Sequence, residues 1–344
     1  MTGQPGLTVR EVTAEDDAAA LALERCCPQG GAFRIVFARN TFRRRTESFA
    51  KALLLGAWQG DRLVAVGGGA IKNVRWDGSE TRSLMLYDFR VDPEFRRGGV
   101  GRLLTQTLIE WAKPQAEIGI AFSIGDNRAI QAMALEWFGA ATAPAFELLV
   151  YPTLARRPTA AIVDAPAEKV RAGYLAAREA PALLCHADEA LATTQRIASW
   201  TLDDEGAAGC SAWSTAGILE EVVVHLPSAL RAASWLLGGS VACQFGLPHV
   251  PRLGETLRSW LLFDAHARDE MAMRTLVAGA AARARAAGID HCHVVFSPNS
   301  PWRTALWRDV PKAFAPILPF SIMARTLAGK PLYLRDPAID PRDI

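Results

Sequence analysis

The stretch Leu86-Tyr87-Asp88-Phe89-Arg90-Val91-Asp92-Pro93-Glu94-Phe95-Arg96-Arg97-Gly98-Gly99-Val100-Gly101-Arg102-Leu103-Leu104 decides the fold class of this chain. An apolar strand runs into a turn at Asp92-Pro93, and a loop rich in arginine and glycine leads into an amphipathic helix. Glycine lets backbone amides approach a ligand closely, and a helix N-terminus presents unpaired N–H groups with partial positive charge. The stretch therefore predicts a socket for a phosphate or pyrophosphate.

The spacing within the loop narrows the choice of phosphate ligand. The Gly-Lys-Ser/Thr ending of a P-loop is missing, and the glycines do not follow the dinucleotide fingerprint. Read as Arg96-x-x-Gly99-x-Gly101, the loop resembles the acyl-CoA pyrophosphate loop of the GCN5-related N-acetyltransferase (GNAT) superfamily. The resemblance extends over residues 8–152, because the flanking elements follow in the family's order.

Those flanking elements are indicated by hydrophobic periodicity. The sequence predicts strands over residues 8–12, 53–58, 63–75, 83–91, 117–123 and 146–151, and helices after Thr13, over 33–52, after the glycine loop and over 129–138. Gln59-Gly60-Asp61 indicates a hairpin between the second and third strands.

Composition bounds the broad class of the protein. The chain has 344 residues, half of them apolar, and a formal net charge of +2. That length suits about two domains, and the charge argues against a nucleic-acid partner. No apolar run is long enough to cross a membrane, and the N-terminus lacks a signal-peptide pattern. We therefore expect a cytoplasmic protein whose six cysteines are reduced thiols.

The second half of the chain weakly repeats the first. Ser83-Leu-Met-Leu-Tyr-Asp-Phe89 is matched by Ser259-Trp-Leu-Leu-Phe-Asp-Ala265, and Ile120-Ala-Phe-Ser123 by Val294-Val-Phe-Ser297. Asn299 echoes Asn127, and a helix is expected from Asp269 to Ala287. The loop position in the second copy reads Arg268-Asp269-Glu270-Met271-Ala272-Met273, where carboxylates replace glycines and would repel a phosphate.

The repeat leads to a fold class and a domain division. We expect an α/β protein of two tandem GNAT-like domains, each a mixed, mostly antiparallel sheet flanked by helices. The acyl-CoA-binding domain would span residues 1–152, a linker 153–165, and a degenerate copy without a CoA site 166–344.

The resemblance also implies which residues hold the co-substrate, acetyl-CoA or another acyl-CoA. In the family the strand before the loop splays from its neighbour and binds pantetheine by main chain, which implies this role for Phe89, Arg90 and Val91. Backbone amides in the loop would hold the pyrophosphate, and arginine side chains would add charge; these residues are Arg96, Arg97, Gly98, Gly99, Val100, Gly101 and Arg102. Asn127 matches the family's asparagine that caps a helix and touches the cofactor, although a plain N-cap is an equal alternative.

The catalytic residues are harder to assign. The family's usual acid, a tyrosine after the asparagine, is absent, since Met133 and Ala134 occupy that region. Tyr87 stands where a glutamate base often lies and could act as an acid or orient the acceptor; otherwise it is a strand aromatic. Asp88 is the second candidate, but the repeat keeps Asp264 there, which favours a structural role.

The acceptor is not readable from the sequence. An arginine run, Arg39 and Arg43 to Arg45, falls where the family lines its acceptor cleft and would suit an acidic group; a solvated helix face is the alternative. His291-Cys292-His293 lacks further spaced ligands, so no metal site is expected.

The expected function is acyl-CoA-dependent N-acyl transfer, with acetyl transfer to a primary amine of a small molecule as the expected reaction. Two alternatives remain open. The acyl donor could be an acyl carrier protein facing the basic loop, or the protein could be a non-catalytic acyl-CoA sensor. We also leave open the acyl chain length, the oligomeric state and whether the second domain contributes to the acceptor site.

Overall fold

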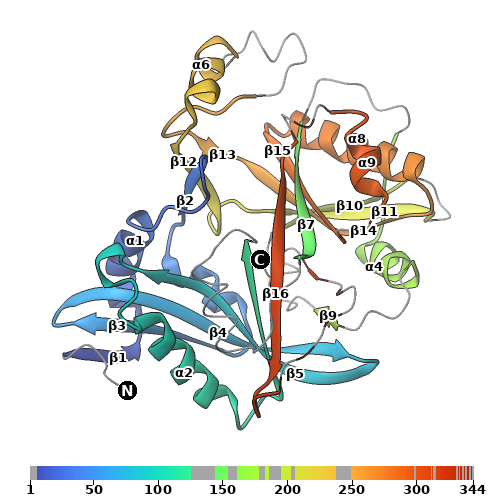
Figure 1. The fold of residues 1–344 in the computed structure, drawn as a ribbon. Coiled ribbons are helices and arrows are strands. Elements are labelled where there is room, and N and C mark those ends of the chain that lie inside the picture. Colours follow the sequence, from blue (N-terminus) through green and yellow to red (C-terminus); the bar gives the residue numbers. More distant parts are fainter. Residues whose placement is uncertain are drawn as a thin grey trace.

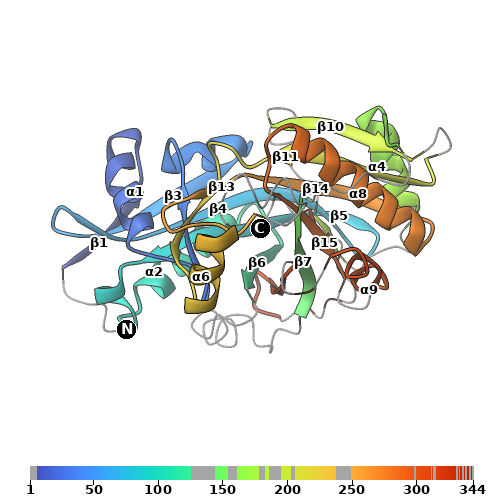
Figure 2. The same cartoon turned by 90° about the horizontal axis from the view of Figure 1, so that it is seen from above.

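A single large sheet runs through both halves of the chain in the computed structural model (Figure 1). The structure describes residues 6–124, 144–153, 161–177, 183–185, 195–202, 206–237, 249–297, 300–310, 312, 315–330, 332, 334, 337, 339, 340 and 342. We call residues 1–152 the first half and residues 166–344 the second half. Figure 2 shows helices α1 and α2 with the first half, and α4, α8 and α9 with the second.

The helices and strands alternate along the chain. The first part comprises β1 (Leu7–Glu11), η1 (Ala14–Asp16), α1 (Asp17–Arg25), β2 (Arg34–Ala38), η2 (Phe42–Arg44), η3 (Thr46–Ser48), β3 (Ala52–Gln59), β4 (Arg62–Trp76), β5 (Ser79–Val91), η4 (Pro93–Phe95), α2 (Val100–Ala112), β6 (Ile118–Ile124) and β7 (Pro144–Pro152). The remainder comprises β8 (Val163–Asp164), α4 (Ala167–Ala176), β9 (Leu183–Cys185), β10 (Arg196–Thr201), β11 (Ala208–Ser214), β12 (Glu220–His225), α6 (Ser228–Leu237), β13 (Thr256–Leu257), β14 (Ser259–Ala267), α8 (Glu270–Ala286), β15 (His291–Phe296), α9 (Trp302–Leu306) and β16 (Ile317–Thr326).

The two halves exchange strands at the middle of the sheet. The 13-stranded sheet has the order β1-β3-β4-β5-β6-β16-β7-β15-β14-β11-β10-β8, with β9 attached to β4. Strand β16 of the second half is therefore the antiparallel neighbour of β6, and β7 of the first half is the antiparallel neighbour of β15. Because β16 and β7 also pair with each other, each half is completed by a strand from the other. The predicted linker 153–165 contains β8, and the two-domain division there stays a prediction.

The repeat predicted from sequence is visible in the backbone. Asp88 and Asp264 both have positive φ, +54° and +52°, and each lies where its antiparallel register shifts at a bulge. Aspartate is one of the few residues that adopt this left-handed conformation without a large penalty. Together with parallel pairs β5–β6 and β14–β15, the shared bulge confirms the tandem fold class.

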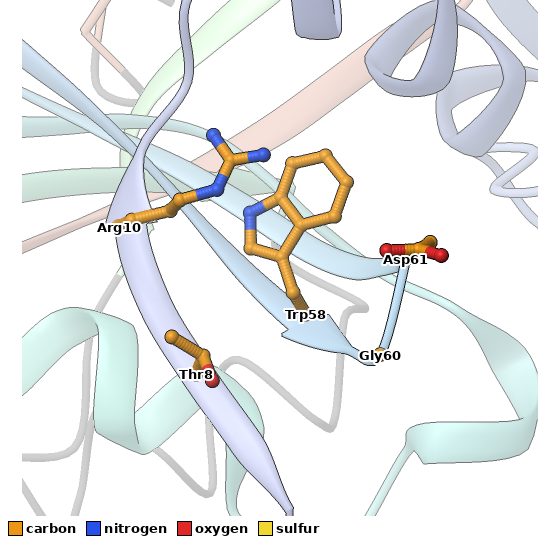
Figure 3. Close-up of a pocket in the computed structure, with 5 residues that line it drawn as sticks. All are labelled: Thr8, Arg10, Trp58, Gly60 and Asp61. Atoms are coloured by element: carbon orange, nitrogen blue, oxygen red, sulfur yellow. The ribbon is translucent and has the colours of Figure 1, made fainter.

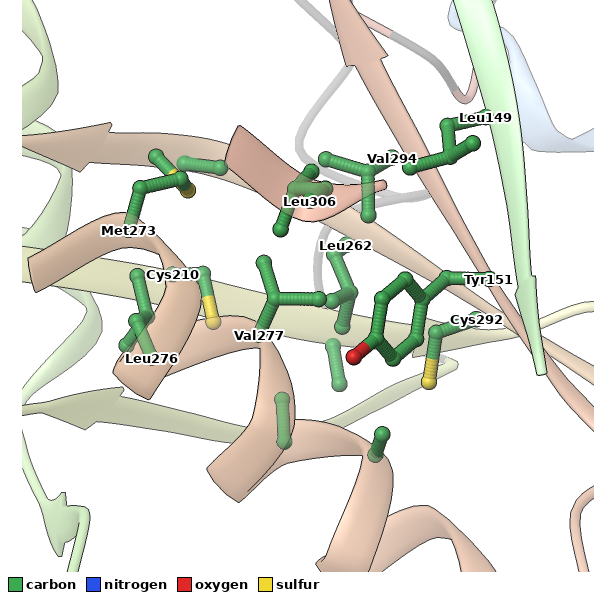
Figure 4. Packing of buried hydrophobic residues seen from close by; sticks show 14 of the residues in the cluster. Leu149, Tyr151, Cys210, Leu262, Met273, Leu276, Val277, Cys292, Val294 and Leu306 are labelled. Carbon is green, nitrogen blue, oxygen red and sulfur yellow. The ribbon is translucent and has the colours of Figure 1, made fainter. Parts of the chain in front are cut away.

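The core of the second half uses side chains from the first. Leu149 and Tyr151 of β7 pack with Met273, Leu276 and Val277 of α8 in one buried cluster (Figure 4). All five side chains are less than 5% exposed. Since a buried leucine or aromatic side chain contributes about 1.5–3 kcal/mol through the hydrophobic effect, β7 is part of what stabilises the second half.

The helix predicted over residues 33–52 is wrong. Strand β2 and the short 3-10 helices η2 and η3 occupy this segment. The β-branched and aromatic run Ile35-Val36-Phe37 favours a strand, and β12 pairs with it across the chain to form a separate sheet with β13. This small sheet joins the two halves a second time.

Most other predicted elements of the first half are confirmed. The strands at 8–12, 53–58, 63–75, 83–91, 117–123 and 146–151 correspond to β1, β3, β4, β5, β6 and β7. The helix predicted over 129–138 lies outside the described residues. Among the described helices, none is both long and apolar enough to span a bilayer.

Candidate functional site

The glycine loop ends in an uncapped helix N-terminus. Gly99 has φ +78° as the N-cap of α2, and no side chain caps the helix there. The first intrahelical bond at this end runs from the Leu103 amide to the Gly99 carbonyl at 3.0 Å. The amides of Val100 and Gly101 therefore precede the intrahelical ladder and can meet an anion.

The loop backbone is open on the side of Gly99. A Cβ placed on Gly99 would meet no atom within 4 Å, so the positive φ, and not close packing, favours glycine here. Val100 is buried and anchors the helix start, whereas Arg96, Arg97 and Arg102 are exposed. The Gly98 amide donates to the Phe95 carbonyl at 3.3 Å, so it serves the loop itself.

Strands β5 and β6 separate next to this loop. Their parallel pairing ends at Leu86 and Ala121, while β5 continues to Val91 and β6 to Ile124. The predicted pantetheine segment, Phe89 to Val91, lies in this separated part. The Val91 carbonyl accepts hydrogen bonds from Arg96 Nε at 3.2 Å and from the Cys27 thiol at 3.4 Å. The glycine loop therefore follows directly after the part of β5 that is separated from β6.

At the equivalent position in the second half, an aspartate side chain caps the helix start. Strand β14 ends at Ala267 and α8 begins at Glu270, so only Arg268 and Asp269 connect them. The Asp269 carboxylate is the N-cap and accepts a hydrogen bond from the Ala272 amide at 2.8 Å. A carboxylate therefore occupies the position that an anionic phosphate would need.

Asp88 is held in a buried charge network. Arg39 donates to both of its carboxylate oxygens, at 2.5 and 3.0 Å, and Arg45 donates at 3.2 Å. Burial opposes ionisation of Asp88, but Arg39 and Arg45 outweigh it and hold the pKa of the carboxyl far below its usual range. Asp88 is thus fixed as an anion, which supports a structural role over proton transfer.

The same network extends to α1 through Glu24. Glu24 is fully buried and accepts from Arg90 Nε at 2.6 Å, and Arg39 Nη2 lies 3.2 Å from its other oxygen. The sequence prediction that Arg39 and Arg45 face an acidic acceptor is therefore not supported by their contacts. Arg44 is exposed and Arg43 half-buried, on η2 and not on a helix face.

Tyr87 is packed between the halves. Its hydroxyl donates to Thr46 Oγ1 at 3.0 Å, and its ring lies 5.0 Å from that of Phe49. Burial raises the pKa of Tyr87 above its ordinary value. The ring fits because β4 carries glycine opposite it: a Cβ on Gly68 would lie 2.4 Å from the Tyr87 ring.

A separate hollow of about 380 Å³ lies at the outer edge of the sheet and is lined by Thr8, Arg10, Trp58, Gly60 and Asp61 (Figure 3). The Arg10 guanidinium covers the Trp58 ring at 4.1 Å and is paired with Asp16 at 2.6 Å. None of its lining residues belongs to the glycine loop or the separated part of β5. We assign it no part in the site.

Several relevant residues escaped the sequence reasoning. Gly67 and Gly68 of β4 make room for Phe89 and Tyr87, and the run Gly67-Gly68-Gly69 was a visible signal of close approach. Glu24 lies on α1 with no motif around it, and nothing in the sequence connects it to Arg90. Asn127 lies outside the described residues, so its predicted role stays a prediction.

Comparisons with known proteins agree with this geometry. Residues 20–140 match the model of the family described as Acetyltransferase (GNAT) family. The N-myristoyltransferase of Saccharomyces cerevisiae with bound myristoyl-CoA is similar over 96% of this chain and 85% of its own, with a TM-score of 0.59 and 12% identity. A GCN5-related N-acetyltransferase from Kribbella flavida is similar over 92% and 70%, with a TM-score of 0.50 and 16% identity. No curated protein matches the sequence. At these identities the two structures show a shared fold.

Proposed function

Residues 20–140 of this chain belong to the GNAT acetyltransferase family, and on that premise we propose that the protein transfers an acyl group from acyl-CoA to an amine. The observation that carries the proposal is the uncapped start of α2 beside the separated end of β5. In this proposal the start of α2 binds the pyrophosphate, and the separated end of β5 offers main-chain groups to the pantetheine arm. The second half keeps the fold without the open loop, so we propose one acyl-CoA site per chain.

The bound myristoyl-CoA of the yeast structure gives independent support for an acyl-CoA as the donor. We propose acetyl-CoA as the simplest donor and a small-molecule primary amine as the acceptor. The carrier-protein alternative keeps a basis in the exposed Arg96, Arg97 and Arg102. The sensor alternative is favoured by the buried, hydrogen-bonded state of Tyr87 and Asp88, the two predicted catalytic residues.

Acyl transfer to an amine makes three chemical demands. An amine has a pKa of about 10 and must lose a proton before it attacks. The tetrahedral oxyanion needs donors, for which the backbone amides of the separated strand are suited. The leaving thiolate, with a thiol pKa of about 8.5, needs little acid assistance. A proton acceptor for the amine is therefore the main requirement beyond binding.

Acetyl-CoA binding should depend on Gly99. In Gly99→Glu a carboxylate would occupy the phosphate position, and we expect affinity to fall at least about tenfold, or ~1.4 kcal/mol. Gly99→Ala is the matched control, because it carries the same positive-φ strain without the charge. Calorimetry with acetyl-CoA measures both variants. Equal affinity in Gly99→Glu and wild type would remove the loop from the site.

Tyr87 should have a modest effect on turnover. Tyr87→Phe keeps the ring against Phe49 and removes only the hydroxyl that donates to Thr46. Because backbone donors serve the oxyanion and the thiolate leaves readily, we expect kcat to fall by less than about a hundredfold. A larger loss would place the Tyr87 hydroxyl among the acid–base groups. Thr46→Val removes the partner of the same hydrogen bond and serves as the comparison.

The experiment that tests the proposed function is a thiol-release assay. Purified full-length protein with acetyl-CoA is screened against primary amines, amino acids, aminoglycosides and an acyl carrier protein, and mass spectrometry identifies the acylated product. The proposal predicts release of CoA that depends on one class of amine. Tight binding of acetyl-CoA without release with any acceptor would favour the sensor.

A further inference from the structure

A carboxylate from the second half reaches the edge of the first. Strand β12 pairs antiparallel with β2, and Glu221 lies directly opposite Phe37. Directly opposite residues point to the same face, with Cβ atoms about 4.5–5.5 Å apart. Glu221 therefore shares the face of Phe37, although the two residues are far apart in sequence. Figure 1 shows β12 and β13 meeting β2 above the first half.

This face is the one that looks toward the separated end of β5. The Phe37 ring lies 5.7 Å from the guanidinium carbon of Arg90 and 5.9 Å from that of Arg39. Arg90 belongs to β5, and its Nη1 donates to the Phe89 carbonyl at 2.9 Å. The β2–β12 ladder thus places Glu221 opposite Phe37, whose ring lies against the guanidinium group of Arg90 from β5.

The charged groups around Glu221 have other partners. Arg39 is held by Asp88 and Glu24, and Arg90 by Glu24. Glu255, beside β13, accepts from His249 at 2.6 Å, and His225 at the end of β12 bonds the Ala32 carbonyl. Arg34 and Glu220 lie on the opposite face of the ladder. Within the part of the chain that the structure describes, Glu221 makes no hydrogen bond and no ion pair. The residue as a whole is half-buried.

We propose that Glu221, supplied by the second half, is the general base that takes a proton from the acceptor amine at the acyl-CoA site of the first half. This role rests on the proposed function. It gives the second half, where Asp269 caps the start of α8, a part in the chemistry. It also selects an acceptor that is a cation in solution, since an unpaired carboxylate attracts an ammonium group.

The step conserves atoms and charge. The Glu221 carboxylate takes one proton from the ammonium, leaving a neutral amine and a carboxylic acid. The amine nitrogen attacks the thioester carbonyl carbon, a C–N bond forms and the C–S bond breaks, and the sulfur leaves with the bonding electrons. The nitrogen then loses its second proton, which neutralises the thiolate. The products are an amide and CoA thiol, and Glu221 returns its proton to solvent.

The surroundings of Glu221 give its carboxyl group a pKa suited to a general base near neutral pH. Burial raises the pKa of Glu221 to about 7, and no neighbouring cation lowers it again. A base works best when its pKa lies near the operating pH. Since only the carboxylate accepts a proton, amine transfer should rise with pH through about 7 and then level off. Asp88, by contrast, is held as an anion by two arginines and is a poor proton acceptor.

The test compares two nucleophiles in Glu221→Gln, which is close in shape. A primary alkylamine is an ammonium at pH 7 and needs a base, whereas hydroxylamine is largely neutral and does not. We expect acetyl transfer from acetyl-CoA to the alkylamine to fall about a hundredfold or more, with transfer to hydroxylamine changed less than about threefold. The step in the pH profile near 7 should disappear, and Glu221→Asp should restore part of the alkylamine rate.

The matched control is Glu220→Gln, since Glu220 is the neighbour on the opposite face of β12. It should keep wild-type rates with both nucleophiles, and calorimetry should show unchanged acetyl-CoA affinity in both glutamine variants. Wild-type rates and an unchanged pH profile in Glu221→Gln would overturn the role of Glu221 while leaving the proposed function intact. If wild-type protein releases no CoA with either nucleophile, the proposed function fails first.

Discussion

Replacing Asp88 by alanine is expected to destabilise the protein by about 3–5 kcal/mol, because it removes the buried carboxylate that pairs with both Arg39 and Arg45. Arg39 and Arg45 are both less than 10% exposed, and Asp88 accepts three hydrogen bonds from them. Alanine would also have to adopt φ near +54°, which adds strain. Urea unfolding followed by tryptophan fluorescence measures the loss.

The repeat provides a control for Asp88. Asp264 occupies the equivalent bulge and pairs with Arg171. Burial raises the pKa of Asp264, and the negative charge of Asp340 raises it further, although Arg171 lowers it in part. Its carboxylate is therefore less favoured as an anion, and we expect Asp264→Asn to cost clearly less than Asp88→Asn at pH 7. Equal losses at the two positions, or a loss below about 1 kcal/mol in Asp88→Ala, would contradict the account of this network.

The stability that Asp88 provides should also depend on pH. Its pKa is lowered in the folded protein, so the contribution is complete above the unfolded value of about 3.9 and is lost as pH falls through the folded value. Asp88→Asn should remove the part of the pH dependence of the unfolding free energy that comes from Asp88. The difference in unfolding free energy between wild type and variant should shrink below pH 4.

Residues 1–152 alone are expected to aggregate. In the full chain β16 covers one edge of β6, and β7 lies between β16 and β15. Truncation leaves β6 and β7 with unpaired edges and exposes Leu149 and Tyr151, which pack on α8. Open strand edges and apolar patches are recognised causes of association. Light scattering of the purified fragment measures this directly.

Co-expression of residues 153–344 is the control for truncation, since it returns β15 and β16 as partners. The expected result is a soluble complex of the two fragments. A fragment of residues 1–152 that is soluble, monomeric and fully able to bind acetyl-CoA would show that the strand exchange is not needed for folding.

The local parts of this fold were readable from sequence. The strand, turn, loop and helix around Gly99 are contiguous, so residue type and periodicity were enough to predict them. The degenerate loop before α8 was equally visible, because Asp269 stands where glycine would be needed. In both cases the backbone conformation is determined by residues that are close together in the sequence.

The non-local parts were not readable. The exchange of β7 and β16 pairs strands that are far apart in the sequence. Hydrophobic periodicity predicts a strand but does not indicate which strand lies beside it. Arg39 was assigned to an acceptor cleft because its partners, Glu24 and Asp88, meet it only in the folded state. The segment 33–52 was misread for the same reason: its strand is stabilised by β12 of the second half.

The central claim is that the chain has one acyl-CoA site, at the glycine loop of the first half, and that the second half keeps none. Isothermal titration calorimetry of full-length protein with acetyl-CoA tests it most directly. We predict one molecule bound per chain in wild type, weakened at least about tenfold in Gly99→Glu and unaltered in Asp269→Ser, which keeps a capping residue before α8. Two molecules per chain, or binding that Gly99→Glu leaves unchanged, would contradict the account.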